Sequence, residues 1–162
     1  MKRRTALAWV GAVPLGLHSG AQSQPRETPL PTPASLRSAA LAAQSQGEPL
    51  VLLVSIAGCP WCELLRRNYL APMRAEGLPA FQIKVDDRTT AVANFKAQAS
   101  TGADIASAYQ AKLTPTVMFF NAQGIEIAPR IAGVASADLL GAQLDNALRT
   151  ARERLAKDKS TL

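Results

Sequence analysis

An apolar run, Leu50-Val-Leu-Leu-Val-Ser-Ile56, lies directly before the cysteine motif Gly58-Cys-Pro-Trp-Cys62. The run is rich in β-branched residues, which is typical of a strand buried on both faces of an α/β sheet. After the motif, apolar residues recur at helical spacing up to about Pro72; they are Leu64, Leu65, Tyr69 and Leu70. These features predict a buried strand, a short junction that carries both cysteines, and a helix.

The spacing of the two cysteines suits a redox-active pair. Cys59 is expected at the N-terminus of the helix, where unpaired backbone N–H groups and the helix dipole favour a thiolate. Pro60 fits the first helical turn because its missing N–H group is not needed there. Cys62 follows three residues later on the same face. The two thiols can therefore close a small disulfide ring that opens without unfolding the chain.

Two other uses of the cysteines stay open. Exported proteins often carry structural disulfides, but these usually close longer loops. Zinc prefers four ligands, and the chain has neither a second Cys-x-x-Cys motif nor a cluster of histidines. Cu(I) could bind the two thiolates together with Met73 or Met118, although Met118 lies in an apolar strand and is expected in the core. The interpretation that the sequence favours is therefore a redox-active cysteine pair without a metal site.

Residues 1–21 have the three-part layout of a secretory signal peptide. A basic start, Lys2-Arg-Arg4, precedes a mostly apolar stretch from Thr5 to Leu17, and small residues follow at Ser19 and Ala21. The apolar stretch is shorter than the roughly 20 residues of a membrane-spanning helix. We therefore expect cleavage, export to the periplasm and no stable membrane insertion. Either the general secretory route or the twin-arginine route fits this segment.

Removal of the signal peptide changes the chemistry that remains. His18 is the only histidine, so catalysis by a nucleophile–histidine pair and zinc binding through imidazole are excluded in the mature chain. The net charge falls from +6 to +3, because Lys2-Arg-Arg4 are lost. The basic residues near the C-terminus complement a helix dipole, and aromatic residues make up only 5%. Nucleic acid is therefore not an expected partner.

The mature chain is expected to hold one domain. Residues 22–33, with four prolines, are predicted to be an extended leader without packed structure. Residues 34–156 form the predicted domain, and 157–162 a frayed tail. Thr32-Pro33 is expected to start a helix that runs to Gly47.

Further elements follow from local patterns. Strands are predicted at Phe81–Asp86, Thr116–Phe120 and around Ile125–Pro129, and a short helix at Ala103–Ala111. The stretch from Arg88 to Thr101 fits a helix or a short extra strand. Ser136 is expected to cap a final helix with one apolar side, made of Leu139, Leu140, Leu144, Leu148 and Leu155.

From Leu50 to Leu155 the chain resembles the thioredoxin superfamily. The resemblance rests on Gly58-Cys-Pro-Trp-Cys-Glu63, on Leu113-Thr-Pro-Thr-Val-Met-Phe-Phe120 and on Gly124, and is greatest to exported thioredoxin-like proteins. It implies an α/β fold with a central mixed β-sheet flanked by helices in a single domain.

The resemblance also implies roles for single residues. Pro115 would be the cis-proline that faces the cysteines, and Thr114 would offer its backbone as a docking edge for a substrate strand. Gly133 would lie beside the substrate groove, where a side chain would obstruct binding. Gly58, Pro60 and Trp61 would complete the substrate-binding surface around the catalytic Cys59 and Cys62.

Some positions depart from the family pattern. Thioredoxin has a buried acid in the preceding strand, where this chain has Leu53, and a tryptophan before the first cysteine, where it has Gly58. The Pro-Trp pair between the cysteines is closer to the glutaredoxin pattern. Glu63, Arg66 and Arg67 are expected to be solvated residues of the helix, although Arg66 could stabilise a nearby thiolate.

Together these features predict an exported thiol–disulfide oxidoreductase that reduces protein disulfides. Cys59 attacks as a thiolate and Cys62 resolves the mixed disulfide, with no cofactor beyond the Cys59–Cys62 disulfide itself. The expected partners are protein disulfides or thiols and a membrane thiol relay as electron donor, and the protein is expected to be a monomer. The alternative is a thioredoxin-fold binding module, such as one that delivers Cu(I) through the cysteine pair.

Overall fold

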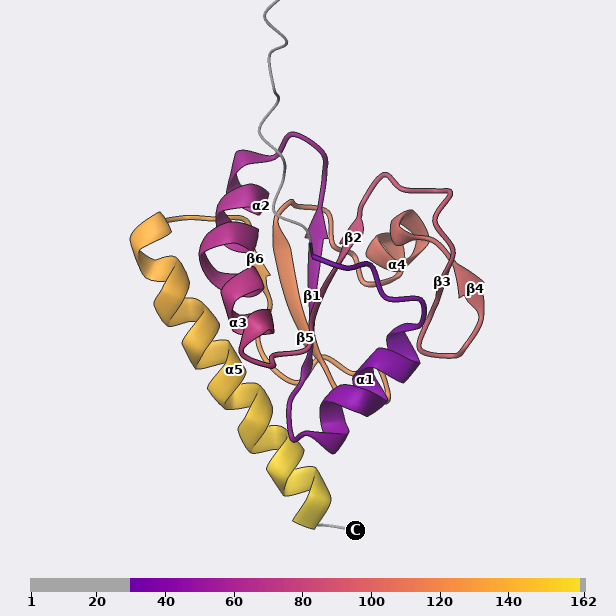
Figure 1. Ribbon diagram of the computed structural model, residues 1–162, viewed down its shortest axis with the longest axis vertical. Coiled ribbons are helices and arrows are strands. Elements are labelled where there is room, and N and C mark those ends of the chain that lie inside the picture. Colours follow the sequence, from indigo (N-terminus) through magenta and orange to yellow (C-terminus); the bar gives the residue numbers. More distant parts are fainter. Residues whose placement is uncertain (1–29, 161–162) are drawn as a thin grey trace, which may run out of the picture.

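A computed structural model describes residues 30–160, which form a four-stranded sheet with helices on both faces (Figure 1). The strand order is β2-β1-β5-β6, and the sheet is mixed, as the family resemblance implies. The predicted signal peptide and most of the predicted leader lie outside the described residues.

The apolar run Leu50–Ser55 forms β1, a central strand whose six residues are all buried. It pairs in parallel with β2 (Ala80–Lys84) and antiparallel with β5 (Thr116–Phe120). Its side chains alternate between two hydrophobic clusters, one on each face of the sheet. This burial on both faces explains why the run is continuous rather than alternating.

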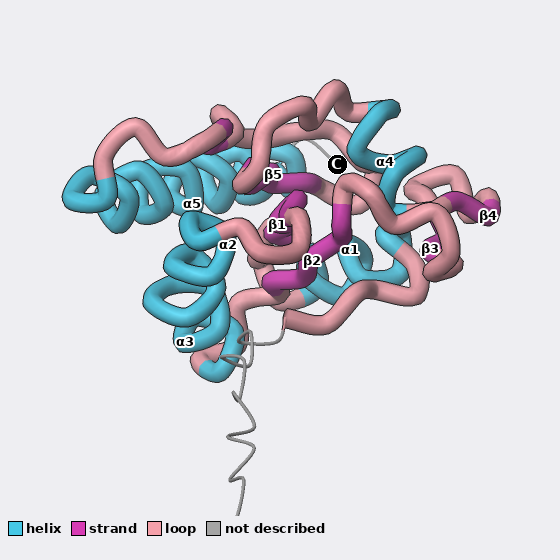
Figure 2. The backbone as a smooth tube through the Cα atoms, turned by 90° about the horizontal axis from the view of Figure 1, so that it is seen from above, coloured by secondary structure: helices cyan, strands magenta, loops and turns pink. Residues whose placement is uncertain are grey.

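Helices cover the two faces in different ways. One face packs against α2 (Pro60–Leu65), α3 (Ala71–Ala75) and the long α5 (Ala137–Ser160). The other packs against α1 (Leu36–Ser45) and α4 (Gly102–Ala108). Figure 2 shows the two groups on opposite sides of the strands. No helix between residues 30 and 160 is long and apolar enough to cross a membrane.

A single π-helical turn, η1 (Arg66–Leu70), joins α2 to α3. The backbone N–H group of Ala71 donates to the carbonyl of Arg66, five residues earlier. The helix predicted after the cysteines is therefore confirmed, but it contains a π turn that the apolar spacing does not reveal.

The segment before α1 is extended and packed. Leu30 is only 3% exposed and belongs to the core cluster on the α2 side of the sheet. The backbone N–H group of Gln82 in β2 donates to the carbonyl of Pro31 at 3.0 Å. The expectation of an unpacked leader is therefore wrong for its last residues. The helix also begins later than Thr32-Pro33, because Ser35 is its N-cap and accepts from the Ser38 N–H group.

The ambiguous stretch between β2 and α4 contains a small hairpin. Its strands are β3 (Val92–Ala93) and β4 (Ala99–Ser100). Phe95, between the strands, packs its ring against Tyr109 and Phe120. This aromatic contact attaches the hairpin to the domain and favours the extra strand over a helix.

Two expectations near the C-terminus need correction. The antiparallel partner of β5 is β6 (Ile131–Ala132), whereas the segment around Ile125–Pro129 contributes an isolated bridge between Phe120 and Glu126. The last helix, α5, continues to Ser160, so the predicted frayed tail 157–162 is helical for most of its length. Leu139 is exposed, in contrast to the other leucines expected on the apolar side.

Candidate functional site

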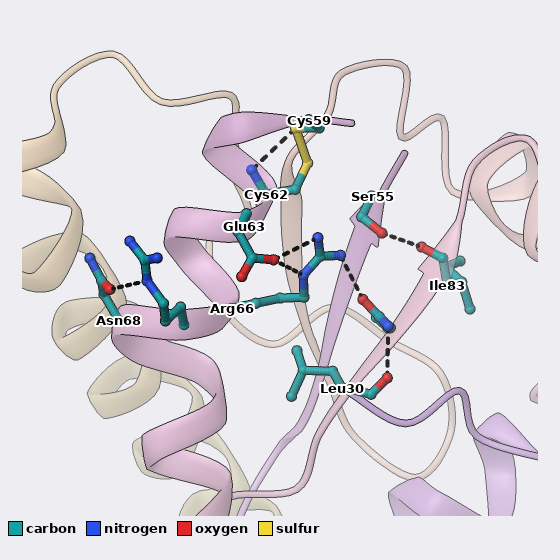
Figure 3. Close-up of polar contacts among 10 residues, drawn as sticks. Leu30, Ser55, Cys59, Cys62, Glu63, Arg66, Asn68 and Ile83 are labelled. Carbon is teal, nitrogen blue, oxygen red and sulfur yellow. Dashed lines mark hydrogen bonds and ion pairs between the residues drawn. A yellow bond between two sulfur atoms is a disulfide. The ribbon is translucent and has the colours of Figure 1, made fainter. Parts of the chain in front are cut away.

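Cys59 and Cys62 form a disulfide at the junction of β1 and α2 (Figure 3). Gly58 turns the chain there with a φ of 72°, a conformation that side chains disfavour. Cys59 is the N-cap of α2, and its sulfur accepts a hydrogen bond from the Cys62 N–H group at 3.1 Å. Pro60 occupies the first helical turn, as expected. A thiolate at Cys59 would receive the same N–H hydrogen bond.

The two cysteines differ in exposure. Cys62 is completely buried, whereas Cys59 is half-buried. Gly58, Pro60 and Trp61 are exposed around them, with 45% of Trp61 accessible. Cys59 is therefore the cysteine that a second molecule can contact, whereas Cys62 is shielded.

Strand pairing brings the second predicted segment to the same end of the sheet. Val54 pairs with Thr116, so the residues before Thr116 run beside those after β1. The Thr114–Pro115 peptide bond is cis. Thr116 also pairs with Ala132, and the Gly133 N–H group donates to the carbonyl of Pro115 at 2.7 Å. Thr114, Pro115 and Gly133 therefore lie at the same end of the sheet as the cysteines.

Exposed apolar side chains gather on the segments around the disulfide. Ile56 follows β1, Trp61 lies between the cysteines, and Leu113 precedes Thr114-Pro115 and is 58% exposed. Water-exposed side chains of this size are informative when they cluster. Ile56 and Leu113 were not expected at the site from the sequence. Their position just outside strand ends is the signal that could have indicated them.

Arg66 is buried, which corrects the expectation of a solvated helix residue. Only 1% of its side chain is exposed, whereas Arg67 is exposed as expected. The reason is helical phase: Arg66 lies four residues after the buried Cys62 and next to the buried Leu65. Glu63 is mostly buried as well, with 26% of its side chain exposed, and forms an ion pair with Arg66.

The Arg66 guanidinium connects three segments of the chain (Figure 3). Its Nε and Nη2 donate to Glu63 Oε2 at 3.3 and 3.1 Å, and its Nη1 donates to Gln82 Oε1 at 3.0 Å. Gln82 Nε2 in turn donates to the carbonyl of Leu30 at 2.7 Å. Leu53, in the position of the thioredoxin acid, is fully buried and apolar. The charged groups below the cysteines are therefore Glu63 and Arg66 on the helix itself.

One carboxyl group at the same end of the sheet has an unusual environment. Asp87 follows β2, which runs parallel to β1 and ends beside it. Hydrogen bonds from Thr90 and Thr89 hold the pKa of the Asp87 carboxyl well below its usual range. The side chain thus fixes the turn between β2 and the hairpin as an anion at neutral pH.

The methionines considered for copper occupy different environments. Met118 is fully buried in the core, as predicted, and Met73 packs against the core from α3. Among the described side chains, no three of histidine, cysteine, aspartate and glutamate are grouped so that they could hold a metal ion. Binding of Cu(I) would therefore depend on the two thiolates themselves.

Comparison with solved structures identifies the same fold elsewhere. DsbH oxidoreductase superposes with a TM-score of 0.50 at 13% identity, over 86% of this chain and 95% of that one. Oxidised thioredoxin O2 from Arabidopsis thaliana matches with a TM-score of 0.45 at 17% identity, over 70% of this chain and 93% of that one. At 13% identity the likeness to DsbH oxidoreductase concerns the fold alone.

Comparison of the sequence with protein families gives a direct match. No curated protein matches the sequence. The family model of the thioredoxin-like domain, however, matches residues 36–148, which include the disulfide, the cis-proline and every strand of the sheet. The chain therefore belongs to the thioredoxin-like domain family.

Proposed function

We propose that the protein is an exported thiol–disulfide oxidoreductase that reduces protein disulfides. The observation that carries the proposal is the asymmetry of the cysteine pair. Cys59 is accessible and accepts a backbone hydrogen bond at the start of α2, whereas Cys62 is buried beneath it. An accessible attacking thiol beside a shielded second thiol is the arrangement that a two-step exchange requires.

The reaction proceeds in two exchanges. The Cys59 thiolate attacks one sulfur of a substrate disulfide, forming a mixed disulfide and releasing the other substrate sulfur as a thiolate, which takes up a proton. The Cys62 thiol then loses its proton and attacks the sulfur of Cys59, which releases the second substrate thiol. The substrate gains two electrons and two protons, and the Cys59–Cys62 disulfide forms. A membrane thiol relay is the proposed donor that reduces this disulfide again, and no further cofactor is needed.

The surface around the cysteines would position an extended substrate segment. Thr114 offers backbone groups for strand-like pairing, and Gly133 leaves room beside it. Trp61, Ile56 and Leu113 provide apolar contacts. Cleavage of residues 1–21 would deliver a monomer to the periplasm, where substrate disulfides can persist.

The proposal is tested by trapping the mixed disulfide. In a Cys62→Ser variant the resolving thiol is missing, so complexes with substrates should accumulate and collapse on reduction. A Cys59→Ser variant is the matched control and should give none, because Cys62 is buried. Non-reducing gels of the exported fraction, followed by mass spectrometry, would show the complexes and their partners.

Two outcomes would contradict the proposal. A folded, exported Cys62→Ser protein without mixed disulfides would favour the binding module, since Cu(I) delivery requires no covalent protein complex. Equal trapping by the two single variants would show that the assignment of attacking and resolving thiols is wrong.

A further inference from the structure

We propose that Arg66 is a positioning residue for the Cys59–Cys62 pair: its buried guanidinium holds the Glu63 carboxylate away from the sulfurs and neutralises its charge. The inference rests on the proposed redox function of the two cysteines. It gives a role to a buried charge that the exchange chemistry does not itself use.

Helix geometry places the ion pair directly below the disulfide. Glu63 lies four residues after Cys59, and Arg66 four residues after Cys62, so each stands on the same helix face as one cysteine. The backbone N–H group of Arg66 also donates to the Cys62 carbonyl. Figure 3 shows the Glu63 carboxylate pointing toward the Arg66 guanidinium and not toward the disulfide.

Contacts from outside the helix fix the guanidinium. Gln82 is oriented by both ends of its amide, because Oε1 accepts from Arg66 while Nε2 donates to Leu30. A neutral acceptor satisfies the arginine without adding a second negative charge. The Glu63 carboxylate therefore receives two hydrogen bonds from a cation that is held by Gln82 of β2, and Gln82 is in turn held by the segment before α1. Such a pair is geometrically specific, since the planar guanidinium donates in fixed directions.

The pair controls the charge that a thiolate at Cys59 experiences. An uncompensated carboxylate at Glu63 would disfavour the thiolate, because like charges repel more strongly where water is excluded. The cation of Arg66 cancels this effect.

Other charged residues lie on the elements around the cysteines, but most face water. Lys84 and Asp86 at the end of β2, Lys112 before β5, and Asp138 in α5 are exposed, so solvent and salt screen them. Asp87 is held in its own turn by Thr89 and Thr90. These charges are the same in the unmodified protein and in the Arg66 and Glu63 variants, so they do not change the difference between their alkylation midpoints.

The test measures how the alkylation rate of reduced Cys59 depends on pH. The midpoint of this profile reports formation of the thiolate. In Arg66→Met the midpoint should move upward by about half a pH unit, because the Glu63 charge is no longer compensated. In Glu63→Gln it should move downward by about the same amount, because the carboxylate charge that opposes the Arg66 cation is removed. In the double variant it should return to the position of the unmodified protein.

Two further variants separate charge from packing. Arg67→Met removes a neighbouring exposed arginine from the same helix and should leave the midpoint unchanged. Arg66→Lys keeps the charge but loses the planar fork. It should lower the melting temperature while the midpoint stays near that of the unmodified protein.

The proposal fails if the two single variants shift the midpoint in the same direction or not at all, or if the double variant does not restore it. If Arg66→Met does not fold, Glu63→Gln alone decides, and an unchanged midpoint overturns the proposal. These measurements need no substrate. Failure of the proposed function would instead appear as a Cys62→Ser protein, with Glu63 and Arg66 intact, that forms no mixed disulfides through Cys59.

Discussion

Leu30 should contribute to stability like a core residue, although it precedes the first helix. Its side chain is 3% exposed and packs in the cluster that contains Leu53 and Leu65. Replacing a buried leucine by alanine costs about 2–5 kcal/mol. Leu30 lies in an extended segment outside any helix or strand, where the backbone can relax toward the space left by the side chain, so we expect the lower part of this range. For Leu30→Ala the free energy of unfolding should fall by about 2–3 kcal/mol.

This loss is large enough to measure by thermal unfolding. For a domain of this size, each kcal/mol corresponds to about 3–5 °C in Tm, so Leu30→Ala should melt roughly 6–15 °C lower. Far-UV circular dichroism of the oxidised protein provides the measurement. The substitution keeps the backbone carbonyl that Gln82 binds, so the effect isolates the side chain.

Leu41→Ala is the matched control. Leu41 lies in α1 and is 53% exposed, so its loss should change the free energy of unfolding by no more than about 0.5 kcal/mol. If Leu30→Ala melts within about 2 °C of the control, the segment before α1 does not belong to the folded core, and the reasoning from burial is refuted.

Three further outcomes follow from local contacts. In the chain without residues 1–21, reduction of the disulfide should raise the fluorescence of Trp61, because a disulfide quenches a neighbouring indole; a Cys59→Ser/Cys62→Ser variant should not respond to reductant. Gly102→Ala should cost about 1–3 kcal/mol in chemical denaturation, because the new Cβ would lie 2.5 Å from the Lys84 carbonyl; an unchanged midpoint would contradict this. Asp87→Ala should lower Tm at pH 7, and the difference from the unmodified protein should vanish at strongly acidic pH. The folded state lowers the pKa of this carboxyl, so its stabilisation is present above the unfolded value of about 3.9 and is lost as the pH falls through the lower folded value.

The parts of the fold that depend on local sequence could be predicted. The run before Cys59 is continuous because β1 is buried on both faces, and the cysteines follow it without a loop. Strand β5 could be located for a similar reason, since Thr116–Phe120 is also buried throughout. The positions of Thr114, Pro115 and Gly133 came from the family resemblance, and the strand register places all three beside the end of β1.

The parts that depend on distant contacts could not be predicted in the same way. Arg66 has the composition of a surface residue, and its burial requires both Glu63 on its own helix and Gln82 on another element. Leu30 lies in a proline-rich context, and its burial depends on the core cluster and on Gln82 of β2, which are distant in the sequence. The extent of α5 was underestimated because the charged residues after Leu155 resemble a solvated tail, although charge does not prevent an exposed helix from continuing.

The π turn after α2 has a consequence for which single-residue deletions the fold can tolerate. A hydrogen bond that spans five residues instead of four accommodates one extra residue within an otherwise regular helix. The turn from Arg66 to Leu70 therefore holds one residue more than a regular α-helix needs to connect the two parts. Deleting an exposed residue of the turn, such as Asn68, would leave a continuous α-helix whose two ends keep their buried faces. The same site is therefore compatible with a chain that has one residue fewer between the cysteines and β2.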